Sequence, residues 1–119
     1  MEVLAAPSAN SIAVRFTVQR QHLNGNRTLH GGCIATIVDV LTSIAIRKLH
    51  RDGQSGVTAS LTVECVNAAQ EAEELLVVAT VSQIGKNLAF TSCRLTRFVD
   101  PTFVIATGAH TKFLGASKL

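Results

Sequence analysis

The sequence predicts a single α+β domain in which one long helix is covered by a curved antiparallel sheet. Three observations support this: apolar residues between Gly32 and Leu49 recur at helical spacing, segments on both sides alternate apolar and polar residues, and turn motifs separate these segments. The 119 residues match the usual size of one domain, and 47% are hydrophobic, which is enough for a packed core. We therefore expect one domain, residues 1–119.

The expected strands lie on both sides of this helix along the chain. A short segment at 3–6 and an alternating segment at 12–19 precede the helix, and the strands after it are expected at 57–66, 75–84, 88–98 and 102–113. Gly85-Lys86-Asn87 is a short turn that indicates a hairpin. Lys48, His50 and Arg51 are expected near the helix end, where positive charge suits the helix dipole.

The charge pattern and composition narrow the possible partners. The net charge is +3, with five Phe and no Trp or Tyr, so a nucleic-acid partner is not expected and a small anionic ligand is compatible. Three strand positions are interpreted as solvated cations: Arg94, Arg97 and Lys112. The apolar runs are too short to span a membrane, and the first residues lack a secretory signal. We expect a cytoplasmic protein, with mitochondria as the alternative compartment.

Asp39 is the first candidate for a catalytic residue. It is the only charged residue of the helical segment before Arg47, and an unpaired carboxylate in such an apolar segment is costly to bury. On a helix it shares a thin polar stripe with three other residues: Gly32, Thr36 and Ser43. The same pattern also fits a solvated helix face with an ordinary surface aspartate.

His30-Gly31-Gly32 stands where this helix is expected to begin. Free backbone N–H groups and the positive end of the dipole meet at a helix start, and glycines allow a ligand oxygen to approach closely. These are the requirements of an oxyanion hole, in which donors stabilise charge developing on a carbonyl oxygen. The tripeptide also fits an ordinary glycine-rich loop that leads into a helix.

Asp39 and the glycines are too far apart to act together within one chain. Asp39 lies seven residues beyond Gly32, which is two turns or about 10 Å along the axis. If both groups act on one substrate, a symmetric dimer would place the helix start of one subunit beside Asp39 of the other.

The run from Asn24 to Asp39 resembles the signature of hotdog-fold thioesterases of the phenylacetate-degradation type. Segments 85–92 and 110–115 are also similar to that family, and the resemblance extends from Val3 to Gly115. It implies a hotdog fold and the hydrolysis of fatty acyl or aryl-acyl coenzyme A (CoA) thioesters to free acid and CoA.

The resemblance also implies catalytic roles. Asn24 and the Gly31 amide would polarise the thioester carbonyl, with His30 holding that end of the site. Asp39 of the neighbouring subunit would activate the attacking water or attack directly, and Thr58 would help to position the water. Because a thiolate leaves with little protonation, one base and one oxyanion site are sufficient, and neither a metal nor a cofactor is expected.

The substrate contacts that the resemblance implies are Gly32, Ser60, Gly85, Lys86, Asn87 and Leu88. Ser60 is expected on the same strand face as Thr58, because side chains two residues apart share a face. Lys86 could meet a phosphate of CoA. The expected assembly is a homodimer and, beyond it, a homotetramer built as a dimer of dimers. One departure from the family is Phe113, which stands where relatives often have His.

The remaining nucleophiles and histidines have simpler interpretations. Cys33 is expected to be a packed side chain, because the sequence places no base beside it, and Cys65 and Cys93 are expected in the core. His110 is expected either to pack within its strand or to lie at the rim of the ligand site.

Two other functions fit the same fold. One is a non-catalytic module that binds acyl-CoA, and the other is a hotdog dehydratase. The presence of Asn24, Asp39 and Thr58 together favours hydrolysis over binding alone. Dehydratases of this fold use a His with an acidic partner in a different arrangement.

Overall fold

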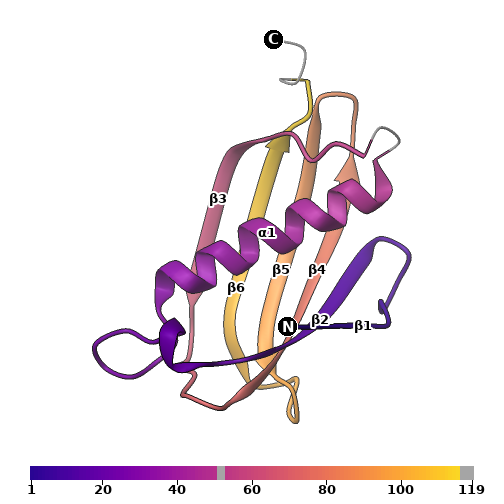
Figure 1. Cartoon of the computed structure of the whole chain (residues 1–119). Coiled ribbons are helices and arrows are strands. Elements are labelled where there is room, and N and C mark those ends of the chain that lie inside the picture. Colours follow the sequence, from indigo (N-terminus) through magenta and orange to yellow (C-terminus); the bar gives the residue numbers. More distant parts are fainter. Residues whose placement is uncertain (51–52, 116–119) are drawn as a thin grey trace.

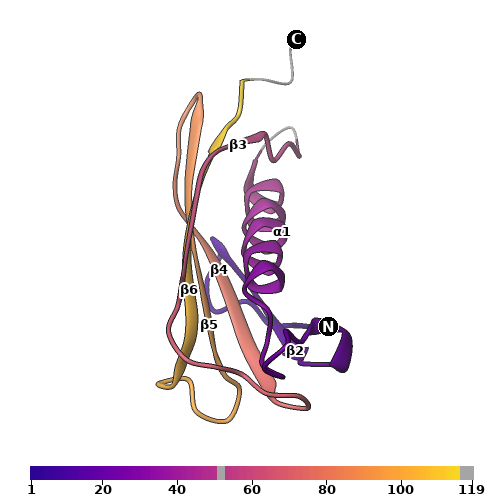
Figure 2. The same cartoon turned by 90° about the vertical axis from the view of Figure 1, so that its left-hand side faces the viewer.

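The computed structural model describes residues 1–50 and 53–115. Within them the chain forms two layers, an antiparallel sheet of six strands and helix α1 (Gly31–Leu49), which lies across one face of that sheet (Figures 1 and 2). The predicted α+β hotdog fold is therefore confirmed, with the helix beginning one residue earlier than expected. Arg51, which we expected near the helix end, lies outside the described residues.

Every expected strand is present, with ends that differ by a few residues. The strands are β1 (Glu2–Leu4), β2 (Ser11–Thr17), β3 (Val57–Cys65), β4 (Glu74–Ile84), β5 (Leu88–Arg97) and β6 (Val104–Phe113). A 3-10 turn, η1 (Arg20–His22), precedes the helix. The sheet order is β1-β2-β4-β5-β6-β3, so β1 and β3 form its two edges. Each neighbouring pair is antiparallel.

The core lies between α1 and the sheet face that it covers. Burial alternates along β4, where Leu75, Val77 and Ala79 are buried and the residues between them are half-buried. Helix residues at helical spacing, such as Val38 and Leu41, complete this core. The two apolar periodicities of the sequence therefore mark the two surfaces that pack together. No helix among the described residues is long and apolar enough to cross a membrane.

The helix approaches the sheet very closely at Gly108 of β6. A Cβ atom at this position would lie 2.6 Å from Cγ1 of Val38, far inside van der Waals contact. A larger residue would therefore require the Val38 side chain or the helix to move. Since Asp39 follows Val38, this contact sets the position of the helix turn that carries the candidate carboxylate.

Strand β3 is an exposed edge. It pairs with β6 on one side only, and all of its residues except Val63 are exposed. Val57 and Leu61 are among the exposed large apolar side chains of the chain. An edge of this kind leaves unpaired backbone N–H and C=O groups available to another strand.

Candidate functional site

The two glycine amides at the start of α1 differ in their hydrogen bonding. His30 is the N-cap residue, and its Nδ1 accepts a hydrogen bond of 2.8 Å from the Gly32 N–H. The Gly31 N–H has no hydrogen-bond acceptor among the described residues. Of the two glycine amides, the Gly31 amide is therefore the one available to a ligand oxygen, while His30 holds the backbone at this end.

Asn24 is fixed beside the helix start by the loop that contains it. Its Oδ1 accepts hydrogen bonds from the backbone N–H groups of Asn26 and Thr28, at 2.9 and 3.1 Å. Its Nδ2 donates to Thr28 Oγ1 at 2.9 Å, which uses one of its two hydrogens. The second amide hydrogen is left for another acceptor.

Asn24 and Gly31 line the same cavity of about 300 Å³. The far wall of this cavity is the end of β3 and the residues after it, including Cys65. Cys65 is exposed, so the expectation that it lies in the core is wrong: β3 is an edge strand that the helix covers only in part. Cys93, on the central strand β5, is buried as expected, and burial raises the pKa of its thiol to about 12.

Asp39 lies in the middle of α1, beside a buried histidine. Its side chain is 48% exposed, and its Oδ1 is 3.9 Å from Nδ1 of His110. This separation is too long for a hydrogen bond, so the carboxylate acts on the imidazole only through its charge. One side of the carboxylate therefore faces a polar cluster, and the other side is open.

His110 connects three elements of the fold. It is fully buried on β6, and its two ring nitrogens contact two hydroxyl groups: Nδ1 lies 2.7 Å from Thr42 Oγ1 on α1, and Nε2 lies 2.8 Å from Thr58 Oγ1 on β3. Of the two expectations for His110, packing within the strand is correct and a place at the rim is not. Thr58 and Asp39 both adjoin this imidazole.

Charges and burial keep the imidazole neutral. Burial and the nearby Lys112 ammonium lower the pKa of His110, whereas Asp39 acts in the opposite direction. The balance is a pKa below the ordinary value for histidine.

Lys112 is a second buried polar group at this site. It is only 5% exposed, and its Nζ donates a hydrogen bond of 2.8 Å to Ser43 Oγ. The expectation that Lys112 is a solvated strand position is therefore wrong, because its side chain points from β6 toward the helix. Burial lowers the pKa of its amine, and Asp39 opposes that shift. The polar stripe on α1 thus has partners from the sheet at both Asp39 and Ser43.

Ser60 does not share a strand face with Thr58, so that expectation is wrong. Thr58 pairs with Lys112 and Ser60 pairs with Thr111, which leaves one extra residue, Ala59, in a β-bulge. Adjacent residues of β6 face opposite sides of the sheet, so their partners on β3 do too. Thr58 faces the helix side and Ser60 the other side, and a direct role for Ser60 toward substrate stays a prediction.

The turn expected to contact CoA lies far from the helix start within one chain. Gly85 donates its backbone N–H to Leu88 O, and Asn87 O accepts from the Leu114 N–H, so the turn is tied to the end of β6. Figure 1 shows this β4–β5 turn at the end of the sheet nearest the end of α1, opposite the helix start. Lys86 is exposed at its tip.

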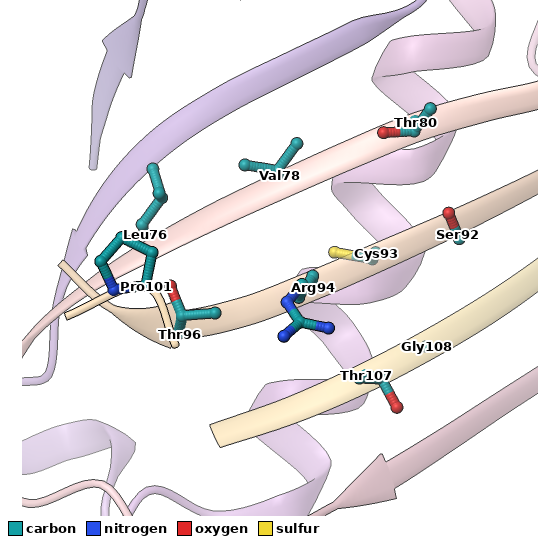
Figure 3. A pocket seen from close by; sticks show the side chains of 10 residues that line it. All are labelled: Leu76, Val78, Thr80, Ser92, Cys93, Arg94, Thr96, Pro101, Thr107 and Gly108. Carbon is teal, nitrogen blue, oxygen red and sulfur yellow. The ribbon is translucent and has the colours of Figure 1, made fainter. Parts of the chain in front are cut away.

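A larger cavity of about 460 Å³ lies on the sheet face away from α1 (Figure 3). It is lined by the residues of β4 that alternate with the core residues, including Leu76 and Val78, and by Arg94 of β5. It contains no carboxylate or imidazole that could act as a base. The candidate catalytic groups therefore lie on the helix side of the sheet.

Comparison with known proteins agrees with this arrangement. Residues 26–103, which include Asp39 and Thr58, match the thioesterase superfamily. The chain belongs to the thioesterase superfamily. This thioesterase is 37% identical to human acyl-coenzyme A thioesterase 13 over 113 residues, which cover 95% of this chain and 78% of the human protein.

Two solved structures show the same fold. The crystal structure of zebrafish thioesterase superfamily member 2 has a TM-score of 0.89 and 38% sequence identity, covering 96% of this thioesterase and 80% of the zebrafish chain. A hypothetical thioesterase from Streptococcus pneumoniae, solved with coenzyme A, has a TM-score of 0.84 at 18% identity, covering 96% and 87% of the two chains. The predicted family is confirmed by the first of these and by the human relative.

Proposed function

We propose that the protein is an acyl-CoA thioesterase that hydrolyses fatty acyl-CoA or aryl-acyl-CoA to the free acid and CoA, with each active site shared by two subunits of a homodimer. The observation that carries this proposal is the separation of two complementary groups along one helix. The start of α1 offers donors to a carbonyl oxygen, and its middle offers a carboxylate next to the same imidazole that the Thr58 hydroxyl contacts. These are the parts that thioester hydrolysis requires.

The distance along the helix supports a shared site. Gly31 and Asp39 are eight residues apart in α1, or about 12 Å along its axis. The oxyanion donors must lie about 3 Å from the carbonyl oxygen, and the attacking atom must lie about 3 Å from the carbonyl carbon. We infer that two β3 edges pair across a two-fold axis, which would bring the donors of one subunit and the carboxylate of the other to the same carbonyl group. The exposed side chains of Val57 and Leu61 favour that edge as the interface.

The chemistry then proceeds with few groups. The thioester oxygen accepts hydrogen bonds from the Gly31 N–H and Asn24 Nδ2 of one subunit. Asp39 of the other subunit removes a proton from water as its oxygen attacks the carbonyl carbon. The tetrahedral intermediate collapses, the carbon–sulfur bond breaks, and the CoA thiolate leaves and is protonated. Direct attack by Asp39 is the alternative, in which a mixed anhydride forms and water then opens it.

The remaining parts of the proposal concern the CoA moiety and assembly. The human relative is named for activity on acyl-CoA, and the S. pneumoniae relative was solved with coenzyme A. In a dimer the exposed Lys86 of the β4–β5 turn is available to a CoA phosphate. The partly apolar sheet face with Leu76 and Val78 is a suitable surface for two dimers to form a tetramer. We place the enzyme in the cytoplasm.

A thiol-release assay with acyl-CoA substrates of increasing chain length, and with an aryl-acetyl-CoA, tests the activity. We expect wild-type turnover and a fall in kcat of roughly 10²- to 10⁴-fold in Asp39→Asn, the usual range for loss of a general base. Asp100→Asn is the matched control, since it makes the same chemical change in a remote turn. Binding of acyl-CoA without wild-type turnover would favour the non-catalytic module, and hydration of an enoyl-CoA would favour the dehydratase.

Mixed dimers test the shared site. In a homodimer, Asn24→Ala removes the carbonyl donor from both sites, and Asp39→Asn removes the carboxylate from both sites. A heterodimer of the two variants has one site with both groups intact and one site with neither. Random mixing makes half of the dimers heterodimers, so we expect recovery of about a quarter of wild-type activity. If the mixture has no more activity than the separate variants, each site is contained within one chain.

A further inference from the structure

The hydroxyl of Thr42 has three polar neighbours but only one proton. Thr42 Oγ1 lies 2.7 Å from Val38 O and 3.2 Å from Asp39 O, both backbone carbonyls of its own helix, and 2.7 Å from His110 Nδ1. Two oxygens 2.7 Å apart repel each other unless a proton lies between them. The Thr42 proton therefore points to Val38 O, and Thr42 must accept a hydrogen bond from the imidazole.

This assignment fixes the tautomer of His110. Its Nδ1 carries the proton that Thr42 accepts, and because the ring is buried and neutral, Nε2 is an acceptor. The Thr58 hydroxyl, 2.8 Å from Nε2, must then be the donor in that contact. The nearby Asp39 does not compete for the Nδ1 proton, because its closest oxygen is 3.9 Å away.

We infer that Thr42 and His110 form a buried hydrogen-bond chain that holds the hydroxyl proton of Thr58 on Nε2 of His110. Thr58 Oγ1 can then act on the catalytic water only as a hydrogen-bond acceptor. This inference rests on the proposed thioesterase activity. Thr42 and His110 are positioning residues, since they act through Thr58 and not on the substrate itself.

The direction of this hydrogen bond matters for the reaction. A water molecule that attacks a carbonyl needs a free lone pair aimed at the carbon, and its two hydrogens are best held by acceptors. Asp39 accepts the hydrogen that is transferred, and Thr58 accepts the second one. If Thr58 instead donated to the water, it would occupy a water lone pair and reduce its nucleophilicity. The buried chain removes that possibility.

Nitrogen NMR of histidine-labelled protein tests the chain directly, because ¹⁵N shifts distinguish the two neutral tautomers. In wild type we expect His110 with its proton on Nδ1. In Thr42→Val, which removes the acceptor but keeps the shape, we expect the proton to move to Nε2, where Thr58 can accept it. A wild-type ring with its proton on Nε2 would overturn the inference.

The kinetics of the same variants test the consequence. We expect kcat of Thr42→Val to fall by about tenfold or more while KM stays unchanged, and Thr42→Ser, which keeps the hydroxyl, to restore it. Thermal unfolding of both variants separates this effect from loss of fold. A folded Thr42→Val with kcat within twofold of wild type overturns the inference. Absence of wild-type hydrolysis despite an Nδ1 proton would instead refute the proposed activity, and with it the role of the chain toward water.

Discussion

The start and the middle of α1 differ in whether the polar groups around them have hydrogen-bond partners. At the start, the Gly31 amide and one hydrogen of Asn24 are left without partners beside a cavity. In the middle, His110 and Lys112 are buried and each of their polar side-chain atoms has a partner. The groups that we propose to bind the developing charge are therefore free, at the first helical residue and in the loop before it, whereas the proposed positioning groups are fixed in the core.

This difference implies that the two regions respond differently to mutation. If the proposed site is correct, a loop residue with few packing contacts contributes mainly to activity, whereas a residue of the buried cluster contributes to activity and to stability together. Measuring kcat and the free energy of unfolding for the same variants therefore separates the two regions. The expected effects below are given from the largest to the smallest.

Asn24→Ala removes the side-chain donor that we propose for the carbonyl oxygen at the helix start. We expect kcat to fall by roughly 10²- to 10³-fold, the usual effect of losing one oxyanion donor. Asn26→Ala is the control, because only its backbone takes part in the loop hydrogen bonds. If Asn26→Ala lowers kcat as much as Asn24→Ala, the loop conformation and not the amide donor is responsible.

Gly108→Ala places a methyl group against Val38 in the middle of the helix. We expect a loss of about 1–3 kcal/mol in the free energy of unfolding, the usual cost of overpacking a core, together with reduced kcat as the Asp39 turn shifts. Urea unfolding measures the first and thiol release the second. Gly25→Ala, where nothing lies within 4 Å of an added Cβ, should change neither stability nor fold. A Gly108→Ala protein of wild-type stability would show that the helix is not held at this contact.

The lowered pKa of His110 makes the buried cluster sensitive to acid. Between that lowered pKa and the ordinary value of 6.5, the unfolded chain binds the proton more readily than the folded chain, so stability falls as pH drops below 6.5 and is regained as pH rises. Asp39 and Lys112 are the charged groups near the ring. We expect the urea midpoint to decrease from pH 7.5 to pH 5.5, and to decrease less in His110→Gln. Equal slopes in both proteins would assign the effect to other groups.

Lys86 should give the smallest effect, since it is an exposed charge at a turn. We expect Lys86→Gln to raise KM for acyl-CoA about two- to fivefold with kcat unchanged, and the difference to shrink at high salt. Lys86→Arg keeps the charge and should have a KM close to that of wild type. A salt-independent change would argue for a packing effect of the turn.

The fold, and the position of the candidate residues near the helix start, could be predicted from the sequence. Helical spacing and strand alternation are local signals, so the helix, the strands and their order along the chain could be predicted from residues close together in the sequence. Asp39 could also be singled out, because a lone charge in an apolar helix needs an explanation.

The residues that the sequence did not reveal depend on contacts between distant segments. Lys112 and His110 follow the same alternation as any strand residue, and only the pairing of β6 beneath α1 shows that they face Ser43 and Thr42. Cys65 was misplaced because a single sequence does not indicate that β3 is the edge strand. The spacing of His110 and Lys112, two residues apart in one strand, was a local sign that they share a face. No other local pattern indicated these contacts.

The bulge in β3 determines where this edge strand can lose a residue without a change in pairing. Ala59 is the one residue there without a pairing partner on β6, while Thr58 and Ser60 are opposite consecutive residues. Loss of Ala59 would restore regular alternation and leave Thr58 opposite Lys112, with its hydroxyl on the imidazole side. Position 59 is therefore where β3 can lose a residue without any change in the pairing of the others.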